Sequence, residues 1–251
     1  MFSENSYKKV VLVTGANDGI GFELVRLLAE KGHKVYLAAR NPTAGKEAEE
    51  RLQTEFGLKA IFVQLDVTNS ATINAARELI EKAEGHLDVL VNNAAVSSDS
   101  ENTSEIDAEE YIRVSTTNFF GLVNCTNTFM PLIRKAKPGY GAIVNVSSFL
   151  GSNSAQASPG VPRIYLQFSA YSASKAAVNS YTIGLAKELI DDKIRVNCVC
   201  PGQVKTKING YAEGGKTPRE GAQLLEPWVL LGPEDDDKTC KYYSNGSPIG
   251  W

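Results

Sequence analysis

Short apolar runs alternate with longer amphipathic segments along this chain. The short runs carry apolar residues at neighbouring positions rather than at every second position, which is typical of strands covered on both faces. In the longer segments apolar residues recur every three to four positions, as on one face of a helix. The predicted strands are Val10–Val13, Lys34–Ala38, Ala60–Gln64, Val89–Asn92, Gly141–Val146 and Arg195–Cys200.

Helical segments lie between these predicted strands. The predicted helices are Gly21–Lys31, Thr43–Phe56, Ser70–Glu84, Tyr111–Lys135 and Tyr171–Ile190. This alternating order predicts an α/β fold, a doubly wound parallel β-sheet with helices on both faces. No repeat or linker divides the sequence, so residues 1–251 are predicted to form a single domain.

Two longer connections and an acidic run complete the predicted order. Gly151–Phe168 and Val204–Arg219 are predicted as loops or short helices at the edge of the sheet, where mobile elements that face a substrate are often found. The acidic run Glu234–Asp237 is predicted as a solvated turn before a last short strand near Lys241–Tyr243.

A glycine-rich turn, Thr14–Gly21 (TGANDGIG), directly follows the first predicted strand and leads into a helix. Glycines allow the backbone to turn tightly and to approach a pyrophosphate, while the helix N-terminus stabilises the anion. Because the turn lies at the first strand-to-helix junction of an alternating chain, it predicts a dinucleotide site.

Tyr171 and Lys175 are four residues apart in a predicted helix, so both side chains project from one face. A phenol has a pKa of about 10, and a nearby ammonium group stabilises the phenolate. Ser148, at the end of the fifth predicted strand, can donate a hydrogen bond to a substrate oxygen. A Tyr-Lys pair at this spacing often occurs by accident, but together with the nucleotide turn and Ser148 it favours proton transfer to or from a carbonyl or alcohol oxygen, with Tyr171 as general acid or base.

Composition and charge exclude several other classes of protein. A net charge of -3 gives no broad basic field, so neither nucleic acid nor a membrane surface is an expected partner. No apolar run approaches the roughly 20 residues of a membrane span, and the first residues lack the apolar stretch of a signal peptide, so a cytoplasmic location is expected.

Cysteine and histidine usage points away from metal sites and from hydrolases. The 4 cysteines have no metal-ligand spacing and are expected to be reduced thiols. With 2 histidines, neither a histidine-based metal site nor a Ser-His-Asp hydrolase is expected, and no metal is predicted. His33 is expected to be a solvated turn residue.

The spacing of the glycines resembles that of the short-chain dehydrogenase/reductase family. Further family landmarks follow in order over nearly the whole chain: Asp66-Val67, Asn92-Asn93-Ala94-Ala95, Asn118, Val146-Ser147-Ser148, Tyr171-Ser172-Ala173-Ser174-Lys175 and Pro201-Gly202. The pattern is most similar to the carbonyl-reductase-like members of the classical branch, and it implies a Rossmann fold. One departure is Ala95, where the family usually has glycine.

The resemblance implies roles for individual residues. The implied catalytic residues are Asn118, Ser148, Tyr171 and Lys175. Asn118 belongs in a kinked helix whose backbone holds a water, Ser147 bonds locally, and Lys175 also binds the nicotinamide ribose. The implied cofactor-binding residues are Gly15, Asn17, Asp18, Gly19, Ile20, Gly21, Arg40, Asp66, Val67, Asn93, Ala94, Tyr171, Lys175, Pro201, Gly202, Val204 and Thr206.

The end of the second predicted strand favours NADP(H) over NAD(H). Ala39 stands where NAD enzymes of the family carry aspartate, and Arg40 follows where a guanidinium can pair with a 2′-phosphate. Asp18 argues the other way, because a carboxylate near a phosphate weakens binding unless it turns away or caps the helix. NADP(H) is therefore predicted, and use of both cofactors is left open.

The segment between Ser148 and Tyr171 is longer than is usual in the family. Its apolar residues indicate an apolar or aromatic substrate surface, or packing against the body or a partner subunit: Phe149, Leu150, Val161, Pro162, Ile164, Tyr165 and Phe168. The loop after Gly202, with Lys205, Lys207, Ile208 and Tyr211, resembles the substrate lid of the family.

The leading hypothesis is an NADP(H)-dependent reductase of a small-molecule ketone or aldehyde, which can also oxidise the matching alcohol. Reduction of an activated carbon-carbon double bond is a second enzymatic hypothesis, and a non-catalytic NADP(H)-sensing or scaffold protein is a third. A homodimer, a homotetramer and a monomer all stay open, because a long insertion in this family can block the usual interface.

Overall fold

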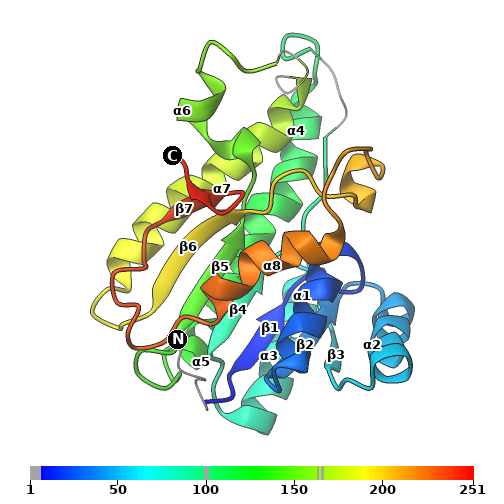
Figure 1. Cartoon of the computed structure of the whole chain (residues 1–251), viewed down its shortest axis with the longest axis vertical. Helices are drawn as coiled ribbons and strands as arrows, with labels where there is room; N and C mark the ends of the chain where they lie inside the picture. Colours follow the sequence, from blue (N-terminus) through cyan, green and yellow to red (C-terminus); the bar gives the residue numbers. More distant parts are fainter. Residues whose placement is uncertain (1–6, 99–101, 163, 165–166) are drawn as a thin grey trace.

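A mostly parallel sheet forms the centre of the molecule (Figure 1). The computed structural model describes residues 7–98, 102–162, 164 and 167–251. Over these residues the sheet has 8 strands in the order β3-β2-β1-β4-β5-β6-β7-β8, and only the pair β7-β8 is antiparallel. The strands are β1 (Val10–Val13), β2 (Lys34–Ala39), β3 (Ile61–Gln64), β4 (Val89–Asn92), β5 (Ala142–Val146), β6 (Arg195–Cys200), β7 (Tyr242–Ser244) and β8 (Ser247–Pro248).

Helices cover both faces of this sheet. α1, α2 and α8 pack on one face, and α3, α5 and α7 pack on the other. The predicted doubly wound α/β fold is therefore confirmed. The helical segments are α1 (Gly19–Glu30), α2 (Pro42–Phe56), α3 (Ser70–Glu84), α4 (Ala108–Ser115), η1 (Thr116–Gly121), α5 (Leu122–Ile133), η2 (Phe149–Gly151), α6 (Asn153–Gln156), α7 (Ser169–Glu188), η4 (Lys207–Asn209) and α8 (Pro218–Val229).

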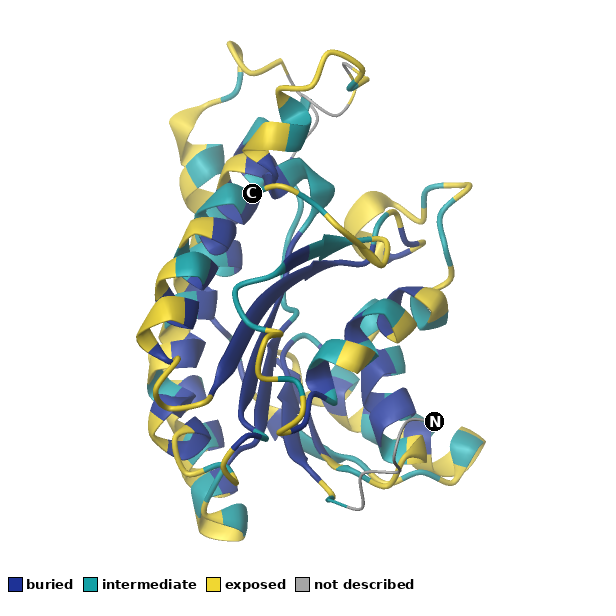
Figure 2. Cartoon of the chain, turned by 60° about the vertical axis from the view of Figure 1, so that its left-hand side comes forward, coloured by how far each residue is buried: buried dark blue, intermediate teal, exposed yellow. Residues whose placement is uncertain are grey.

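Two large hydrophobic cores hold the layers together, one on each face of the sheet, and a smaller cluster includes Leu122 and Tyr242. Every residue of β1, β4, β5 and β6 is buried (Figure 2). Successive side chains of a strand point to opposite faces. In β1, Val10 and Leu12 join one core, whereas Val11 and Val13 join the other. Burial on both faces explains why these strands lack polar alternation.

The long helix predicted over Tyr111–Lys135 is divided in the structure. α4 begins earlier, at Ala108, and a π-helical segment, Thr116–Gly121, separates it from α5. Hydrophobic periodicity does not detect a π segment, because one additional residue in a turn leaves the apolar face nearly continuous.

α8 was missing from the predicted helices, although its first turn carries a recognisable signal. The Thr217 side chain accepts a hydrogen bond from the amide of Glu220 at 3.2 Å, and the Glu220 carboxylate accepts one from the amide of Thr217 at 2.7 Å. Pro218 occupies the first turn. This is a capping box with an N-terminal proline, which favours helix initiation.

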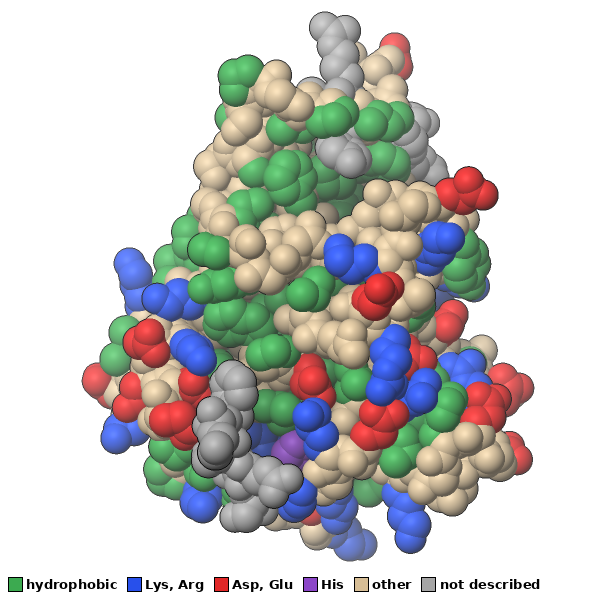
Figure 3. Space-filling view, in the orientation of Figure 1, with side chains coloured by type: hydrophobic (Ala, Val, Ile, Leu, Met, Phe, Trp, Pro, Cys, Tyr) green, Lys and Arg blue, Asp and Glu red, His purple; other side chains and the backbone are tan. Residues whose placement is uncertain are grey.

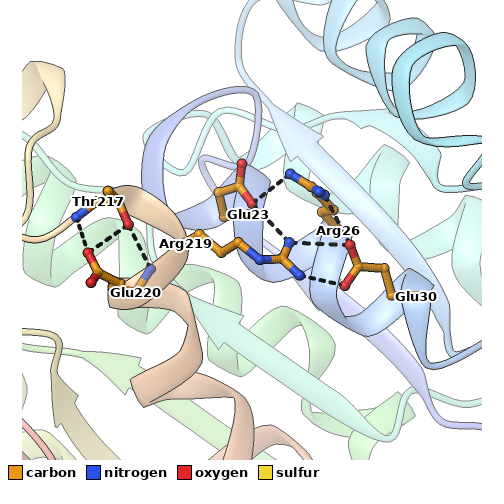
Figure 4. A network of polar contacts seen from close by, with 6 residues as sticks. All are labelled: Glu23, Arg26, Glu30, Thr217, Arg219 and Glu220. Atoms are coloured by element: carbon orange, nitrogen blue, oxygen red, sulfur yellow. Dashed lines mark hydrogen bonds and ion pairs between the residues drawn. The ribbon is translucent and has the colours of Figure 1, made fainter.

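Ion pairs join the start of α8 to α1 (Figure 4). Both terminal nitrogens of Arg219 donate to the carboxylate of Glu30, at 3.2 and 2.8 Å, and Arg219 also reaches Glu23. Arg26 pairs with the same two carboxylates. Exposed pairs contribute about 1 kcal/mol or less each, so the network mainly orients α8 against α1.

Of the two segments predicted as solvated turns, the acidic run Glu234–Asp237 is a largely exposed turn before β7, as predicted, whereas His33 is half-buried. Nδ1 of the half-buried His33 accepts a hydrogen bond from the amide of Lys9 at 3.2 Å, and burial lowers the pKa of this imidazole to about 4. Within the acidic run Glu234–Asp237, Asp235 accepts a hydrogen bond from Lys238 at 2.7 Å. The contact of His33 with Lys9 has no sequence signal because its partner lies 24 positions away, whereas Asp235 and Lys238 are near neighbours in sequence.

Two helical glycines offer a matched test of the packing. An alanine methyl at the buried Gly121 would lie 2.9 Å from Cβ and 3.1 Å from the carbonyl oxygen of Val67, whereas a methyl at Gly184 of α7 would meet nothing within 4 Å. We expect Gly121→Ala to lower the free energy of unfolding by about 1–3 kcal/mol through overpacking. Gly184→Ala should raise it by about 0.5–1 kcal/mol.

Urea unfolding of the two variants measures both changes. Equal stabilisation by the two substitutions would contradict the close packing of η1 against the end of β3.

Candidate active site

The turn after β1 lies directly against the end of β4. Gly15 and Gly19 have φ values of +61° and +59°. A Cβ on Gly15 would lie 2.8 Å from Cα of Ala94, and one on Gly21 would lie 2.6 Å from Nδ2 of Asn93. The close approach of these segments therefore requires glycine, and it leaves a cradle of partly exposed backbone at the start of α1.

Hydrogen bonds fix this contact. Nδ2 of Asn93 donates to the carbonyl oxygens of Thr14 and Gly15, at 2.8 and 3.0 Å. Oγ1 of Thr14 accepts from the amides of Asn93 and Ala94, both at 3.0 Å. Asn93 and Ala94 thus hold the glycine turn in place, in addition to any contact they make with a cofactor.

Asp18 caps α1. This is one of the two arrangements, turning away or capping the helix, in which its carboxylate would not weaken the binding of a phosphate. Oδ1 accepts a hydrogen bond from the amide of Gly19 at 2.7 Å. The amides of Ile20 and Gly21 also belong to the first turn, where amides have no carbonyl partner within the helix. Together with Asn17 on the same turn, they form an arrangement that suits an anionic diphosphate.

The segment after β6 returns to the same turn. Thr206 is buried. A Cβ on Gly19 would lie 3.2 Å from the methyl group of Thr206. A Cβ on Gly221 of α8 would likewise lie 2.8 Å from Cγ2 of Val204. Pro201 and Gly202 begin this segment at the carboxyl end of β6.

The remaining cofactor-binding candidates lie at the ends of β2 and β3. Arg40 follows β2 and is exposed. Oδ1 of Asp66 accepts hydrogen bonds from the amide and hydroxyl of Thr68, at 2.9 and 2.7 Å. Val67 is buried against Gly121 in the π segment. All these candidates lie at the carboxyl edge of the sheet, where open α/β folds bind ligands.

Ser148, Tyr171 and Lys175 meet at this edge. The Ser148 side chain lies near the hydroxyl of Tyr171 and lowers the pKa of that phenol by hydrogen bonding. Nζ of Lys175 lies 5.7 Å from the centre of the Tyr171 ring and donates to the carbonyl oxygen of Val146 at 2.8 Å. Lys175 is buried, although it carries an ionisable ammonium group.

Burial shifts the pKa values of these two groups in opposite directions. Burial around the hydroxyl raises the pKa of Tyr171, the nearby Cys200 adds to the increase, and the hydrogen bond with Ser148 opposes it. Burial lowers the pKa of Lys175 to about 8, and Cys198 and Cys200 oppose that change. Each shift favours the neutral form, as desolvation requires.

Burial, rather than the Lys175 ammonium, sets the direction of the Tyr171 pKa shift in this structure, and a stabilising effect of Lys175 on the phenolate stays a prediction. The ammonium is directed to the Val146 carbonyl rather than to the hydroxyl of Tyr171, and burial dominates the pKa of the phenol. Sequence spacing placed both side chains on one face of α7, but it carried no information on desolvation.

Asn118 lies in the π segment, so the kinked helix implied by the resemblance is present. Oδ1 accepts a hydrogen bond from the amide of Val96 at 2.8 Å, and Nδ2 donates to the Val96 carbonyl at 2.9 Å and to Oγ of Ser174 at 3.1 Å. Ser174 lies between the two catalytic candidates of α7. Asn118 thus connects the segment after β4 to that helix.

Two residues that support the serine segment were missed by sequence reasoning. Asn179 accepts a hydrogen bond from Oγ of Ser147 at 2.6 Å and donates to the carbonyl of Gly151 at 2.8 Å. The Tyr242 hydroxyl donates to the carbonyl of Ser148. Asn179 lies one turn after Lys175, which was an available signal, whereas Tyr242 comes from a distant strand and had none.

Ser147 thus binds α7 rather than a local group. The partner lies 32 positions away in sequence. This contact attaches the end of β5 to the helix that carries Tyr171 and Lys175.

The insertion after Ser148 contacts the C-terminal residues. Oγ of Ser152 donates a hydrogen bond to the carbonyl oxygen of Gly250 at 2.5 Å. The amide of Ser154 donates one to the carbonyl oxygen of Trp251 at 3.2 Å. The Trp251 ring stacks on Tyr242, with centroids 5.2 Å apart.

The apolar residues of the insertion differ in burial, and their role as a substrate surface stays a prediction. Phe149 packs against a core cluster with Leu122, whereas Ile164 is 55% exposed. Tyr165 lies outside the described residues. In the lid-like loop, Tyr211 is 58% exposed. Figure 3 shows hydrophobic side chains gathered on the upper part of the molecule and charged ones on the lower part.

No helix within the described residues is both long and apolar enough to cross a membrane. Over the same residues, no group of three His, Cys, Asp or Glu side chains is placed to hold a metal ion. The cysteines are free, as predicted: Cys125, Cys198, Cys200 and Cys240.

Comparisons with known proteins agree with this geometry. Carbonyl reductase (NADPH) 1 of Bos taurus is 31% identical over 278 aligned residues, which cover 96% of this chain and 98% of the relative. A benzil reductase of Saccharomyces cerevisiae is 37% identical over 241 residues, with 90% and 86% covered. The NADPH-bound carbonyl reductase from chicken fatty liver has a TM-score of 0.84 at 26% identity, with 97% and 99% covered.

The profile of the family described as short chain dehydrogenase matches residues 9–216, which is most of the chain. This match confirms the resemblance drawn from the glycine turn and the later landmarks. The protein belongs to the short-chain dehydrogenase family.

Proposed function

We propose that this protein is an NADP(H)-dependent oxidoreductase that reduces a ketone or aldehyde and can oxidise the matching alcohol, with Tyr171 as the proton donor or acceptor. The observation that carries the proposal is the grouping of Tyr171, Ser148 and Lys175 at the same edge of the sheet as the glycine cradle. The similarity to reductases of the same family supports this reaction type.

The cradle and the end of β2 support NADP(H) as the cofactor. The turn offers backbone amides to a diphosphate, and the Asp18 carboxylate is engaged at the α1 N-terminus. Ala39 ends β2 without a carboxylate for a ribose diol, and the following Arg40 is exposed. Similar proteins carry NADPH in their names. When bound, the nicotinamide supplies the hydride for the carbonyl carbon.

The protein's own residues supply and stabilise the proton. The raised pKa of Tyr171 keeps the phenol protonated near neutral pH, which is the form required for donation to a carbonyl oxygen. The Ser148 hydroxyl stabilises negative charge developing on that oxygen. As Tyr171 loses its proton, the Lys175 ammonium stabilises the phenolate, provided that it carries its charge.

The substrate is proposed to be apolar or aromatic. Exposed apolar residues of the insertion and of the lid-like loop, Ile164, Ile208 and Tyr211, support this class. The benzil reductase among the relatives is named for an aromatic diketone. Oligomeric state stays a prediction.

Tyr171→Phe tests the proton-transfer role. We expect kcat for NADPH-dependent reduction of aryl ketones and aldehydes to fall by about 10²–10⁴-fold, because the donor is removed while the ring stays. The NADPH dissociation constant should change little. Tyr181→Phe is a matched control on α7, since its hydroxyl makes a 3.4 Å contact with Asn127. Equal loss in the two variants would contradict the mechanism.

The same assay separates the alternative functions. With an enone substrate, product analysis distinguishes a reduced carbonyl from a reduced double bond. Absence of turnover by the wild type over the whole panel, together with tight NADPH binding, would instead indicate a binding protein.

The pKa of Lys175 predicts a pH dependence. At a pKa of about 8, the ammonium is charged below that pH and neutral above it, so stabilisation of the phenolate is lost as pH rises through 8. We expect kcat for reduction to be level between about pH 6 and 7.5 and to fall above pH 8. In Lys175→Arg the guanidinium stays charged, so the alkaline decrease should vanish even if the maximal rate is lower. An unchanged pH profile in that variant would assign the decrease to another group.

A further inference from the structure

A hollow of about 270 Å³ lies between the glycine turn and α2. It lies on the cofactor side of the molecule, because one wall is the phosphate-binding turn itself. The small side chains Ala44 and Ala48 leave room in the wall formed by α2. The lining residues are Asn17, Asp18, Ala44, Glu47, Ala48 and Arg51.

Arg51 is the cation in the wall of this hollow. Its guanidinium lies 3.6 Å from the centre of the Phe22 ring, in the first turns of α1 directly after Gly21. Side chains of a helix lean toward its N-terminus, so Arg51 extends toward the start of α2, where Arg40 and Asn41 lie. Stacking on Phe22 holds the guanidinium at the hollow without using its hydrogen-bond donors.

Arg51 and Arg26 both stack on a phenylalanine ring, but they differ in their carboxylate partners. Arg26 lies over Phe56 at 3.7 Å, in a reciprocal contact between α1 and α2, and its guanidinium is paired with Glu23 and Glu30. Arg51 is partly exposed. In the described part of the chain, the interaction that the structure gives for the Arg51 guanidinium is the stacking on Phe22, and no carboxylate is paired with it.

Two carboxylates line the hollow, and they differ in how far their charge is compensated. Asp18 is engaged by the amide of Gly19 at the α1 N-terminus, which partly compensates its charge. Glu47 lies one helical turn before Arg51, on the same face of α2. A phosphate dianion that enters the hollow is therefore repelled by the Glu47 carboxylate. The exposed guanidinium of Arg40 alone offsets this repulsion only in part.

We propose that Arg51 is a second cation for the 2′-phosphate of NADP(H) and, with Arg40, determines preference for this cofactor over NAD(H). The inference rests on the proposed cofactor of this protein. A guanidinium whose donors are free suits a phosphate, which accepts charge-assisted hydrogen bonds. NAD(H) lacks this phosphate, so Arg51 affects the affinity for one cofactor and leaves that for the other unchanged.

Binding of cofactor alone, without substrate, tests this assignment. Dissociation constants for NADPH, NADH and adenosine 2′,5′-bisphosphate are measured by calorimetry on the wild type and on Arg51→Gln. We expect the constants for NADPH and for the bisphosphate to rise about tenfold, as for loss of one charge-assisted hydrogen bond, while that for NADH changes less than twofold. Thermal unfolding verifies that the variant is folded.

Two further variants sharpen the test. Arg26→Gln removes the reciprocal cation on α1 and should leave all three constants unchanged. Glu47→Gln removes the repelling charge and should tighten NADPH binding without changing that of NADH.

The outcomes separate this inference from the proposed cofactor. If the wild type prefers NADPH but Arg51→Gln binds it as the wild type does, the assignment of Arg51 is wrong and the proposed function stands. An equal loss of NADPH and NADH affinity also overturns it, because Arg51 would then serve the packing of α2 on Phe22. A wild type that binds NADH as tightly as NADPH overturns the proposed cofactor itself.

Discussion

Burial of the four central strands on both faces is the constraint on which the rest of this structure depends. β1, β4, β5 and β6 have no exposed residue, so their neighbours must be parallel strands and covering helices. Parallel strands end at a common edge, and the chain leaves each of them there through a loop. The glycine turn, Asn93, Ser148 and Pro201 meet at this edge because each directly follows a buried strand.

At that edge, the structure places ionisable groups where water cannot reach them easily. The cost is visible in Lys175, whose ammonium binds a backbone carbonyl and whose pKa lies near 8. The same desolvation keeps the Tyr171 phenol protonated. Burial thus prepares the acid form of the tyrosine and makes the charge of the lysine sensitive to pH. The serine is held separately, through Ser147 and Asn179 on α7.

The nucleotide side of the edge balances opposite charges. Asp18, which in the sequence argued against a 2′-phosphate, serves as the cap of α1. Its neighbourhood includes the guanidinium of Arg51, which is supported on Phe22 rather than by a carboxylate. In the proposal made for Arg51, the preference between the two nicotinamide cofactors depends on side chains from the turn, from the end of β2 and from the third turn of α2 together.

The sequence by itself determined the fold class, the strand order along the chain and the positions of the catalytic candidates, because these follow from local periodicity and from motif spacing. It also contained the signal for α8, the capping box at Thr217, which was overlooked. Only the tertiary structure decided the π segment around Asn118, the support of the serine segment by Tyr242, the place of Arg51 and the direction of the pKa shift at Tyr171. These features depend on contacts between residues distant in sequence and on the exclusion of water, and neither leaves a local pattern.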